Sequence, residues 1–229
     1  MVQVESRTLR VKFRKIGRLQ YISHLDLVRT VMKVLVRSGL PLKYTEGFNP
    51  KPKLSFAAPL PTGAESVCEF MDIKLASYID TDKALDMLNA NLTDELRAEV
   101  AYYPETKFTE LAYLSYKIVI NTEGKSDALA NRINEFLSQD ELFILKKTKS
   151  GEREVNIKPQ IKEAVATFDG ENILIDCLLS SSPTAFLSPE LFVRLLRSGV
   201  GVLSSPNLMS ENYSIMRTEA YLEDMKIFR

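Results

Sequence analysis

Basic side chains alternate with apolar ones in TLRVKFRK at residues 8–15, where Arg10, Lys12 and Arg14 occupy every second position. A period of two is typical of a strand with one buried face. At the usual rise per residue, neighbouring basic side chains on such a strand lie about 7 Å apart. That spacing matches successive phosphates of an extended nucleic-acid strand. The alternative is that Glu69 and Asp72, in a neighbouring predicted strand, pair with these cations.

Further lysines lie in and beside a proline-rich segment. Residues 44–63, YTEGFNPKPKLSFAAPLPTG, contain four of the ten prolines of the chain. Proline restricts the backbone, so a loop of this composition loses less conformational entropy when it binds a ligand. Lys43, Lys51 and Lys53 would be held on this stiff loop, with Asn49 able to hydrogen-bond in the same turn. The pattern predicts a preformed surface for an anion, unless the prolines serve stability alone.

His24 is the one histidine of the chain and begins a predicted helix. The partial positive charge at a helix N-terminus disfavours imidazolium, so the ring would be neutral and able to act as a general base or hydrogen-bond donor. A structural histidine is the alternative. The aromatic residues Tyr21, Tyr44 and Phe48 lie near basic residues and would stack on nucleic-acid bases.

Composition narrows the classes of function. The chain has 229 residues and a formal net charge of zero, yet residues 1–60 carry twelve Lys/Arg against three Asp/Glu. This asymmetry favours a local anionic partner. GxxxxGK[ST] and GxGxxG motifs are absent, and one histidine with two distant cysteines, Cys68 and Cys177, argues against a metal or cluster site. We expect buried thiols, no cofactor, no membrane partner and a cytoplasmic protein.

The predicted elements of the first half have the order β-α-β-β-α-β of a ferredoxin-like unit. The strand at 8–15 precedes a helix with a capping-box-like start at Ser23 and Asp26 and a stop at Gly39. The remaining elements are strands at 53–60 and 66–75, a helix at 81–92 and a strand at 97–104.

The second half repeats this order with an addition. Strands are predicted at 112–121, 142–149, 153–158 and 213–223, with helices at 126–138 and 188–199, and residues 164–179 are predicted to be an extra hairpin. The fold prediction is therefore α+β, with tandem ferredoxin-like domains at 1–108 and 109–229. This architecture is similar to that of RAMP-type CRISPR repeat-processing endoribonucleases.

Residues 13–75 resemble a bacterial family called radical SAM-linked proteins. The motifs that carry the resemblance are KIG at 15–17, YISHLDL at 21–27, GFNPKP at 47–52, SFAAPLP at 55–61, ExxD at 69–72 and, outside that range, RTEAY at 217–221. Lys51 stands where the family usually has histidine. Family members are encoded beside, or fused to, a radical S-adenosylmethionine enzyme, so the resemblance implies such an enzyme as partner. This chain lacks CxxxCxxC and is not expected to be the radical enzyme itself.

The sequence leads to the hypothesis of a non-catalytic accessory module that binds tRNA or rRNA for a radical SAM RNA-modifying enzyme. Two alternatives are a metal-independent endoribonuclease of RAMP type that uses His24, and a protein-docking scaffold for the radical SAM enzyme. The residues predicted to bind RNA or another anion are Arg10, Lys12, Arg14, Lys15, Arg18, Tyr21, His24, Arg29, Lys43, Tyr44, Phe48, Asn49, Lys51 and Lys53.

Overall fold

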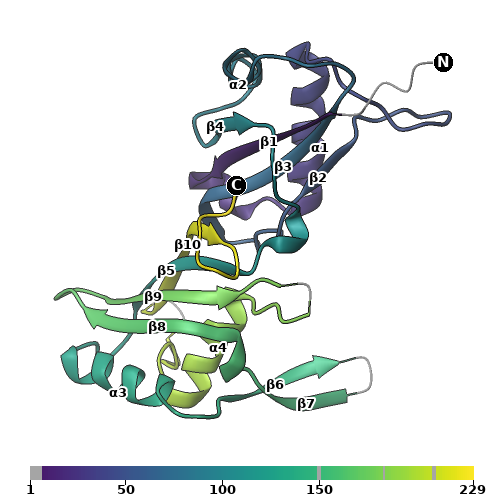
Figure 1. Ribbon diagram of the computed structural model, residues 1–229. Helices are drawn as coiled ribbons and strands as arrows, with labels where there is room; N and C mark the ends of the chain where they lie inside the picture. The colour runs from purple at the N-terminus through teal and green to yellow at the C-terminus, as the bar shows by residue number, and fades with distance from the viewer. Residues whose placement is uncertain (1–6, 149–150, 183, 208–209) are drawn as a thin grey trace. The chain divides into compact units, whose positions relative to one another are not determined.

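The computed structural model describes residues 7–148, 151–182, 184–207 and 210–229 of an α+β protein. The chain divides into two compact units (Figure 1). The N-terminal unit extends to Phe108 and includes Arg229, and the C-terminal unit is Thr109–Phe228. In the part of the chain that the structure describes, no helix is long and apolar enough to cross a membrane.

The N-terminal unit is built on an antiparallel sheet with the strand order β4-β1-β3-β2. The central strands are β1 (Arg7–Lys15) and β3 (Ala64–Leu75), and the outer ones are β2 (Leu54–Phe56) and β4 (Leu96–Tyr102). Alternate residues of β1 and β3 point into the core, which explains the period of two seen in the sequence. The buried residues of these two central strands include Leu9, Val11, Phe13, Met71, Ile73 and Leu75.

Two helices supply the rest of this core. They are α1 (His24–Ser38) and α2 (Thr81–Asn89), and a 3-10 turn, η1 (Gly17–Tyr21), precedes α1. Ser23 caps α1 as predicted, since its Oγ accepts a hydrogen bond from Asp26 N at 3.1 Å and donates to Asp26 Oδ2 at 2.7 Å. The helix ends at Gly39, whose φ of 75° is in the left-handed region that glycine tolerates.

The first half of the proline-rich segment forms the 43–53 hairpin between α1 and β2, and this hairpin extends away from the sheet (Figure 1). Tyr44 and Pro52 form a β-bridge. Thr45 N donates to Lys51 O at 2.8 Å, and Lys53 N donates to Lys43 O at 2.8 Å. The tip is therefore closed by main-chain hydrogen bonds.

The main strands of the C-terminal unit pair in the order β10-β5-β9-β8, and each of these pairs is antiparallel. These strands are β5 (Tyr113–Asn121), β8 (Ile161–Phe168), β9 (Ile173–Ser180) and β10 (Asn212–Tyr221). The helices α3 (Asp127–Leu137) and α4 (Pro189–Val200) bury apolar faces that include Leu129, Ile133, Phe192 and Leu196. Two further 3-10 turns occur at Phe108–Glu110 and Lys158–Gln160.

The added hairpin of this unit was assigned to the wrong segment. Residues 164–179 belong to β8 and β9 of the main sheet, whereas β6 (Phe143–Thr148) and β7 (Gly151–Asn156) form a separate two-stranded sheet (Figure 1). The physical reason is burial. β9 is almost entirely apolar and fits a central position, while the described residues of β7 are mostly exposed and polar. The two cysteines, Cys68 and Cys177, are buried free thiols, as predicted.

Candidate nucleic-acid interface

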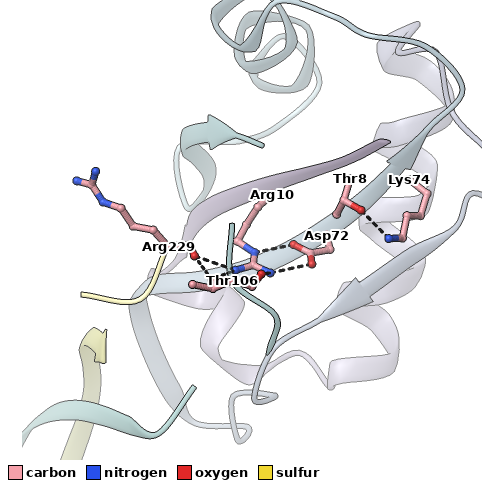
Figure 2. Close-up of polar contacts among 6 residues, drawn as sticks. All are labelled: Thr8, Arg10, Asp72, Lys74, Thr106 and Arg229. Carbon is pink, nitrogen blue, oxygen red and sulfur yellow. Dashed lines mark hydrogen bonds and ion pairs between the residues drawn. The ribbon is translucent and has the colours of Figure 1, made fainter. Parts of the chain in front are cut away.

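Arg10, Lys12 and Arg14 alternate along β1 with the core residues Leu9, Val11 and Phe13, as predicted, and therefore face away from that core. Arg10 nevertheless does not present its charge to solvent, because its side chain is only 1% exposed. The Nε and Nη2 atoms bind the two Asp72 carboxylate oxygens at 2.7 and 3.0 Å. Further hydrogen bonds join the guanidinium to Thr106 and to the main-chain oxygen of Arg229 (Figure 2).

The ring of Phe108 covers the same guanidinium at 4.4 Å from its centroid. The prediction that Arg10 contacts a phosphate is therefore wrong for this structure, and the alternative of pairing with Asp72 is confirmed. The reason is that Asp72 occupies the position directly opposite Arg10 in the β1–β3 register. A buried arginine requires such a partner, since an uncompensated buried charge is costly.

Lys15 is the second correction, because this residue is also buried. The Nζ atom donates to the main-chain oxygens of Leu19 at 3.1 Å and Gln20 at 3.4 Å. The lysine therefore holds η1 against the end of β1 rather than offering a contact to an outside anion. The cause is the sharp turn at Gly17, which folds the chain back over the Lys15 side chain.

Arg14 and Lys12 remain partly accessible but have partners within the unit. Arg14 Nη1 is 3.1 Å from Glu99 Oε1, and Arg14 Nε donates to Asp94 O at 2.8 Å. Lys12 Nζ lies 6.0 Å from the centre of the Phe70 ring. The cations of β1 therefore do not form the uninterrupted phosphate-spaced row that the sequence suggested.

A second group of predicted residues surrounds the start of α1. Arg18 and Tyr21 are exposed, and Arg29 forms an exposed ion pair with Asp26 at 3.2 Å. His24 is half-buried and packs edge-to-face on Phe56, with ring centroids 5.4 Å apart. Among the described residues, no side chain hydrogen-bonds to the His24 ring. This environment is that of a packing residue, and it does not supply the partner that a general base needs for orientation.

The third group lies at the C-terminal end of α1. It consists of Lys43 and Lys53, one on each arm of the 43–53 hairpin, and Lys74 of β3. Lys43 N donates to Lys74 O at 2.8 Å, Lys74 N to Lys53 O at 3.0 Å, and Lys53 N to Lys43 O at 2.8 Å. This ring of main-chain hydrogen bonds holds the three backbones together, and all three side chains are half-buried. The Nζ atom of Lys74 is positioned by a 2.5 Å hydrogen bond to Thr8 Oγ1 (Figure 2).

Arg7 lies at the same end of β1 but faces the other side of the sheet, because it neighbours Thr8, whose hydroxyl binds Lys74. It is exposed, pairs with Leu75 in the β1–β3 register, and has its guanidinium carbon 3.6 Å from the centre of the Tyr78 ring. Leu75 in turn bridges to Leu42, which immediately precedes the hairpin. We call the surface formed by the four lysines the basic end, and it consists of Lys43, Lys51, Lys53 and Lys74.

One member of the basic end, Lys74, was missed from the sequence. The signal for Lys74 was present, because Lys74, like Asp72, alternates on β3 with the core residues Ile73 and Leu75 and therefore faces away from the core. What the sequence did not contain was the pairing of β3 with Lys43 and Lys53.

Aromatic residues extend from the basic end along the 43–53 hairpin. Phe48, at the tip, is fully exposed at 111% of the reference value, and Tyr44 is 41% exposed. Asn49 and Lys51 are exposed beside them, and Lys51 N donates to Thr45 Oγ1 at 3.0 Å. A single exposed apolar residue is common, but a fully exposed phenylalanine on a protruding basic hairpin is typical of a contact surface.

The structure thus places the predicted residues in separate groups. Six lie on the 43–53 hairpin, namely Lys43, Tyr44, Phe48, Asn49, Lys51 and Lys53. The group at the start of α1 is separated from them by the length of the helix, whose 15 residues span about 22 Å at 1.5 Å per residue. Within the hairpin, Glu46 is the one acidic residue against three lysines, so the hairpin carries a net positive charge.

The described residues contain no candidate metal centre. Among these residues, no group of three or more His, Cys, Asp or Glu side chains is arranged to hold a metal ion.

Comparison with known proteins identifies a family for this chain but does not identify a function. A family model described as "Uncharacterized protein conserved in bacteria (DUF2344)" matches residues 8–189. A search of the curated proteins found no match. A crystal structure of an unknown protein from Galdieria sulphuraria is 9% identical, with 93% of this chain and 99% of that chain covered and a TM-score of 0.27. A likeness of that size supports no argument about fold or function.

Proposed function

We propose that this chain, which belongs to the bacterial family DUF2344, is a non-catalytic RNA-binding module that presents tRNA or rRNA to a radical SAM RNA-modifying enzyme. The observation that carries the proposal is the combination of the basic end with an exposed Phe48 at the tip of the 43–53 hairpin. Cations and aromatic rings side by side are the two features that bind unpaired nucleic acid.

Each part of this surface has a separate task. Lys51 and Lys53, with Lys43 and Lys74 behind them, attract the phosphate backbone and displace its counterions. Phe48 and Tyr44 offer flat apolar faces on which unstacked bases pack. Asn49 can donate and accept hydrogen bonds at a base edge. These tasks suit a loop, bulge or end of a structured RNA, where bases are accessible.

The shape of the hairpin supports binding at low entropic cost. Its two arms are joined by main-chain hydrogen bonds, and Pro50 and Pro52 restrict the backbone on one side. A surface that is already ordered loses less conformational freedom when a ligand arrives. The proline content of the segment, which raised the question of an anion site from the sequence, is consistent with that role.

The proposal of a radical SAM enzyme as partner rests on the resemblance of residues 13–75 to the radical SAM-linked family. The chain has two buried cysteines far apart and no CxxxCxxC sequence, so the radical chemistry would belong to the partner. In this proposal the present chain contributes recognition and orientation of the substrate RNA. Delivery of the RNA to the enzyme would raise the local substrate concentration without any catalytic residue here.

The fold we propose for both units is ferredoxin-like, in a tandem arrangement of RAMP type. In the N-terminal unit, the order β4-β1-β3-β2 with helices after the first and third strands supports this assignment. In the C-terminal unit the order β10-β5-β9-β8 is equivalent if the β6–β7 hairpin is an insertion after α3.

The proposal is tested with purified protein and total cellular tRNA, by fluorescence anisotropy at roughly 150 mM salt, where nonspecific binding is weak. We expect a Kd in the micromolar range or below and intact RNA on a denaturing gel of the same samples. Failure to bind would refute the proposal. If the unaltered protein cleaves the RNA and the His24→Ala variant leaves it intact, the endoribonuclease alternative is established instead.

A further inference from the structure

Helix α1 carries an apolar stripe on its surface that is separate from its core-facing side. Leu25 and Val36 are 57% and 59% exposed, and Val28 and Met32 between them are half-exposed. These four residues follow one another at intervals of three, four and four, so they lie along one side of the helix. Neither Val28 nor Met32 belongs to the residues packed on the core of the N-terminal unit.

A row of cations runs beside this stripe. Arg29, Lys33 and Arg37 are all exposed and recur every four residues, one position after Val28, Met32 and Val36. Asp26 is the one acidic residue of α1, and it is paired with Arg29 at 3.2 Å. The exposed side of α1 is therefore apolar along one edge and positively charged along the next.

We propose that this side of α1 is the docking surface for an amphipathic, acidic segment of a partner protein. Apolar side chains of the partner would cover the stripe, and its carboxylates would lie opposite Lys33 and Arg37. The stripe extends over eleven residue steps, or about 16 Å, which corresponds to three turns of a partner helix. A helix that lays its apolar edge on such a surface is an established mode of peptide recognition.

A second copy of this chain fits the surface poorly. Two α1 helices packed stripe against stripe would bring the rows Arg29, Lys33 and Arg37 close to one another, and like charges across an interface are repulsive. A lipid bilayer is also a weaker match, because two of the four stripe residues are half-buried and the stripe has no Trp or Phe to anchor it. An acidic protein segment satisfies both the apolar and the charged edge.

This inference goes beyond the proposed RNA binding, because it concerns a different surface. The hairpin projects from the C-terminal end of α1, whereas the stripe runs along the helix. One chain would then hold RNA on the hairpin and a protein partner along α1, which is the arrangement that a recognition module requires.

The test uses two synthetic helical peptides with the same leucine stripe, one flanked by glutamates and the other by lysines. Binding to the full chain is measured by fluorescence anisotropy, and the contacted residues are mapped by NMR. We expect the glutamate peptide to bind at least tenfold more tightly, a difference of about 1.4 kcal/mol, and to shift the Leu25, Val28 and Met32 methyl signals. Lys33→Glu should remove this preference, and the double variant Leu25→Ser/Val36→Ser should abolish binding.

The matched control is Lys83→Glu, which makes the same charge change on an exposed position of α2 and should leave binding unaltered. Circular dichroism confirms that each variant is folded. The proposal is refuted if neither peptide binds, if both bind equally, or if Lys83→Glu is as harmful as Lys33→Glu. Binding to phosphatidylglycerol vesicles in place of the peptide, or dimerisation that Leu25→Ser/Val36→Ser abolishes, would assign the surface to a membrane or to a second copy.

Discussion

Arg10 and Asp72 face each other across the two central strands of the N-terminal sheet and form an ion pair with two hydrogen bonds. The Nε–Oδ1 and Nη2–Oδ2 distances are 2.7 and 3.0 Å, and the arginine side chain is buried. Thr106 and the main-chain oxygen of Arg229 accept further hydrogen bonds from the same guanidinium. The most central cation of the first strand is thus a structural residue.

Substitution of Arg10 should therefore destabilise the fold rather than weaken the binding of a ligand. We expect Arg10→Ala to lower the free energy of unfolding by about 3–5 kcal/mol, because it leaves Asp72 without its partner in a poorly solvated site. Arg14→Ala, which breaks the more exposed pair with Glu99, should cost no more than about 1 kcal/mol. Urea unfolding followed by circular dichroism measures both values. Equal effects of the two variants would contradict the structural role of Arg10.

Tyr102 gives a prediction about high pH. Burial raises the pKa of this phenol to about 12 from an ordinary value of 10.0, despite the opposing effect of the nearby Arg10 charge. The raised pKa means that the fold favours the neutral phenol. The stabilising contribution is complete below pH 10 and is lost as the pH rises from 10 through about 12.

The Tyr102 hydroxyl is also buried with no hydrogen-bond partner among the described residues. Tyr102→Phe should therefore leave stability at neutral pH unchanged or slightly higher, since no hydrogen bond is lost. The same variant should remove one late-titrating phenol from an ultraviolet absorbance titration and reduce the loss of stability above pH 10. A clear loss of stability at pH 7 would show that the hydroxyl has a partner.

Gly199 of α4 provides a test of packing in the C-terminal unit. A Cβ atom at this position would lie 2.1 Å from Cζ of Phe136 on α3. In an open helix, glycine to alanine stabilises by roughly 1 kcal/mol, but here the added methyl group must displace a ring and should cost about 1–3 kcal/mol. Thermal unfolding of Gly199→Ala measures the net effect, and Gly199→Ala/Phe136→Leu should recover part of the loss. A stabilised Gly199→Ala would contradict the close packing of α3 on α4.

Local patterns in the sequence were sufficient for most elements of the fold. The alternation at 8–15 predicted β1 and its two faces, and Ser23, Asp26 and Gly39 predicted both ends of α1. Such features are decided by neighbours a few residues apart in the chain. The choice between β6–β7 and β8–β9 for the main sheet depends on which strands lie beside β5, and strand periodicity alone does not decide it.

The candidate interface could be predicted only in part for the same reason. Composition identified residues 44–63, because four prolines are concentrated there, and the structure places the nearby lysines on the hairpin at 43–53. The burial of Arg10 depends on its ion pair with Asp72, which is 62 residues away in the chain. The burial of Lys15 depends on a turn that folds over its side chain. Lys74 joins the basic end only through strand pairing. Alternation shows that a cation faces outward, but it does not show what lies over it.

The exposed ring of Phe48 should matter for RNA and not for stability. Phe48→Ala removes a side chain that makes no contribution to the core, so the midpoint of urea unfolding should be unchanged. The loss of one stacked base should weaken RNA binding by about 1–3 kcal/mol. Phe143→Ala, at a half-exposed aromatic residue of β6, serves as the control and should leave the RNA affinity intact. Unchanged RNA affinity of Phe48→Ala would remove the hairpin tip from the interface.

The most direct measurement compares two double charge reversals that change the net charge of the N-terminal unit equally. Lys51→Glu/Lys53→Glu alters the hairpin, and Lys33→Glu/Arg37→Glu alters the exposed side of α1. At roughly 150 mM salt, anisotropy titrations with tRNA should show at least a tenfold loss of affinity, about 1.4 kcal/mol, for the hairpin variant and little change for the α1 variant. Equal losses of RNA affinity in the two variants would mean that only overall charge matters. Unchanged RNA affinity of the hairpin variant would contradict the proposed RNA interface.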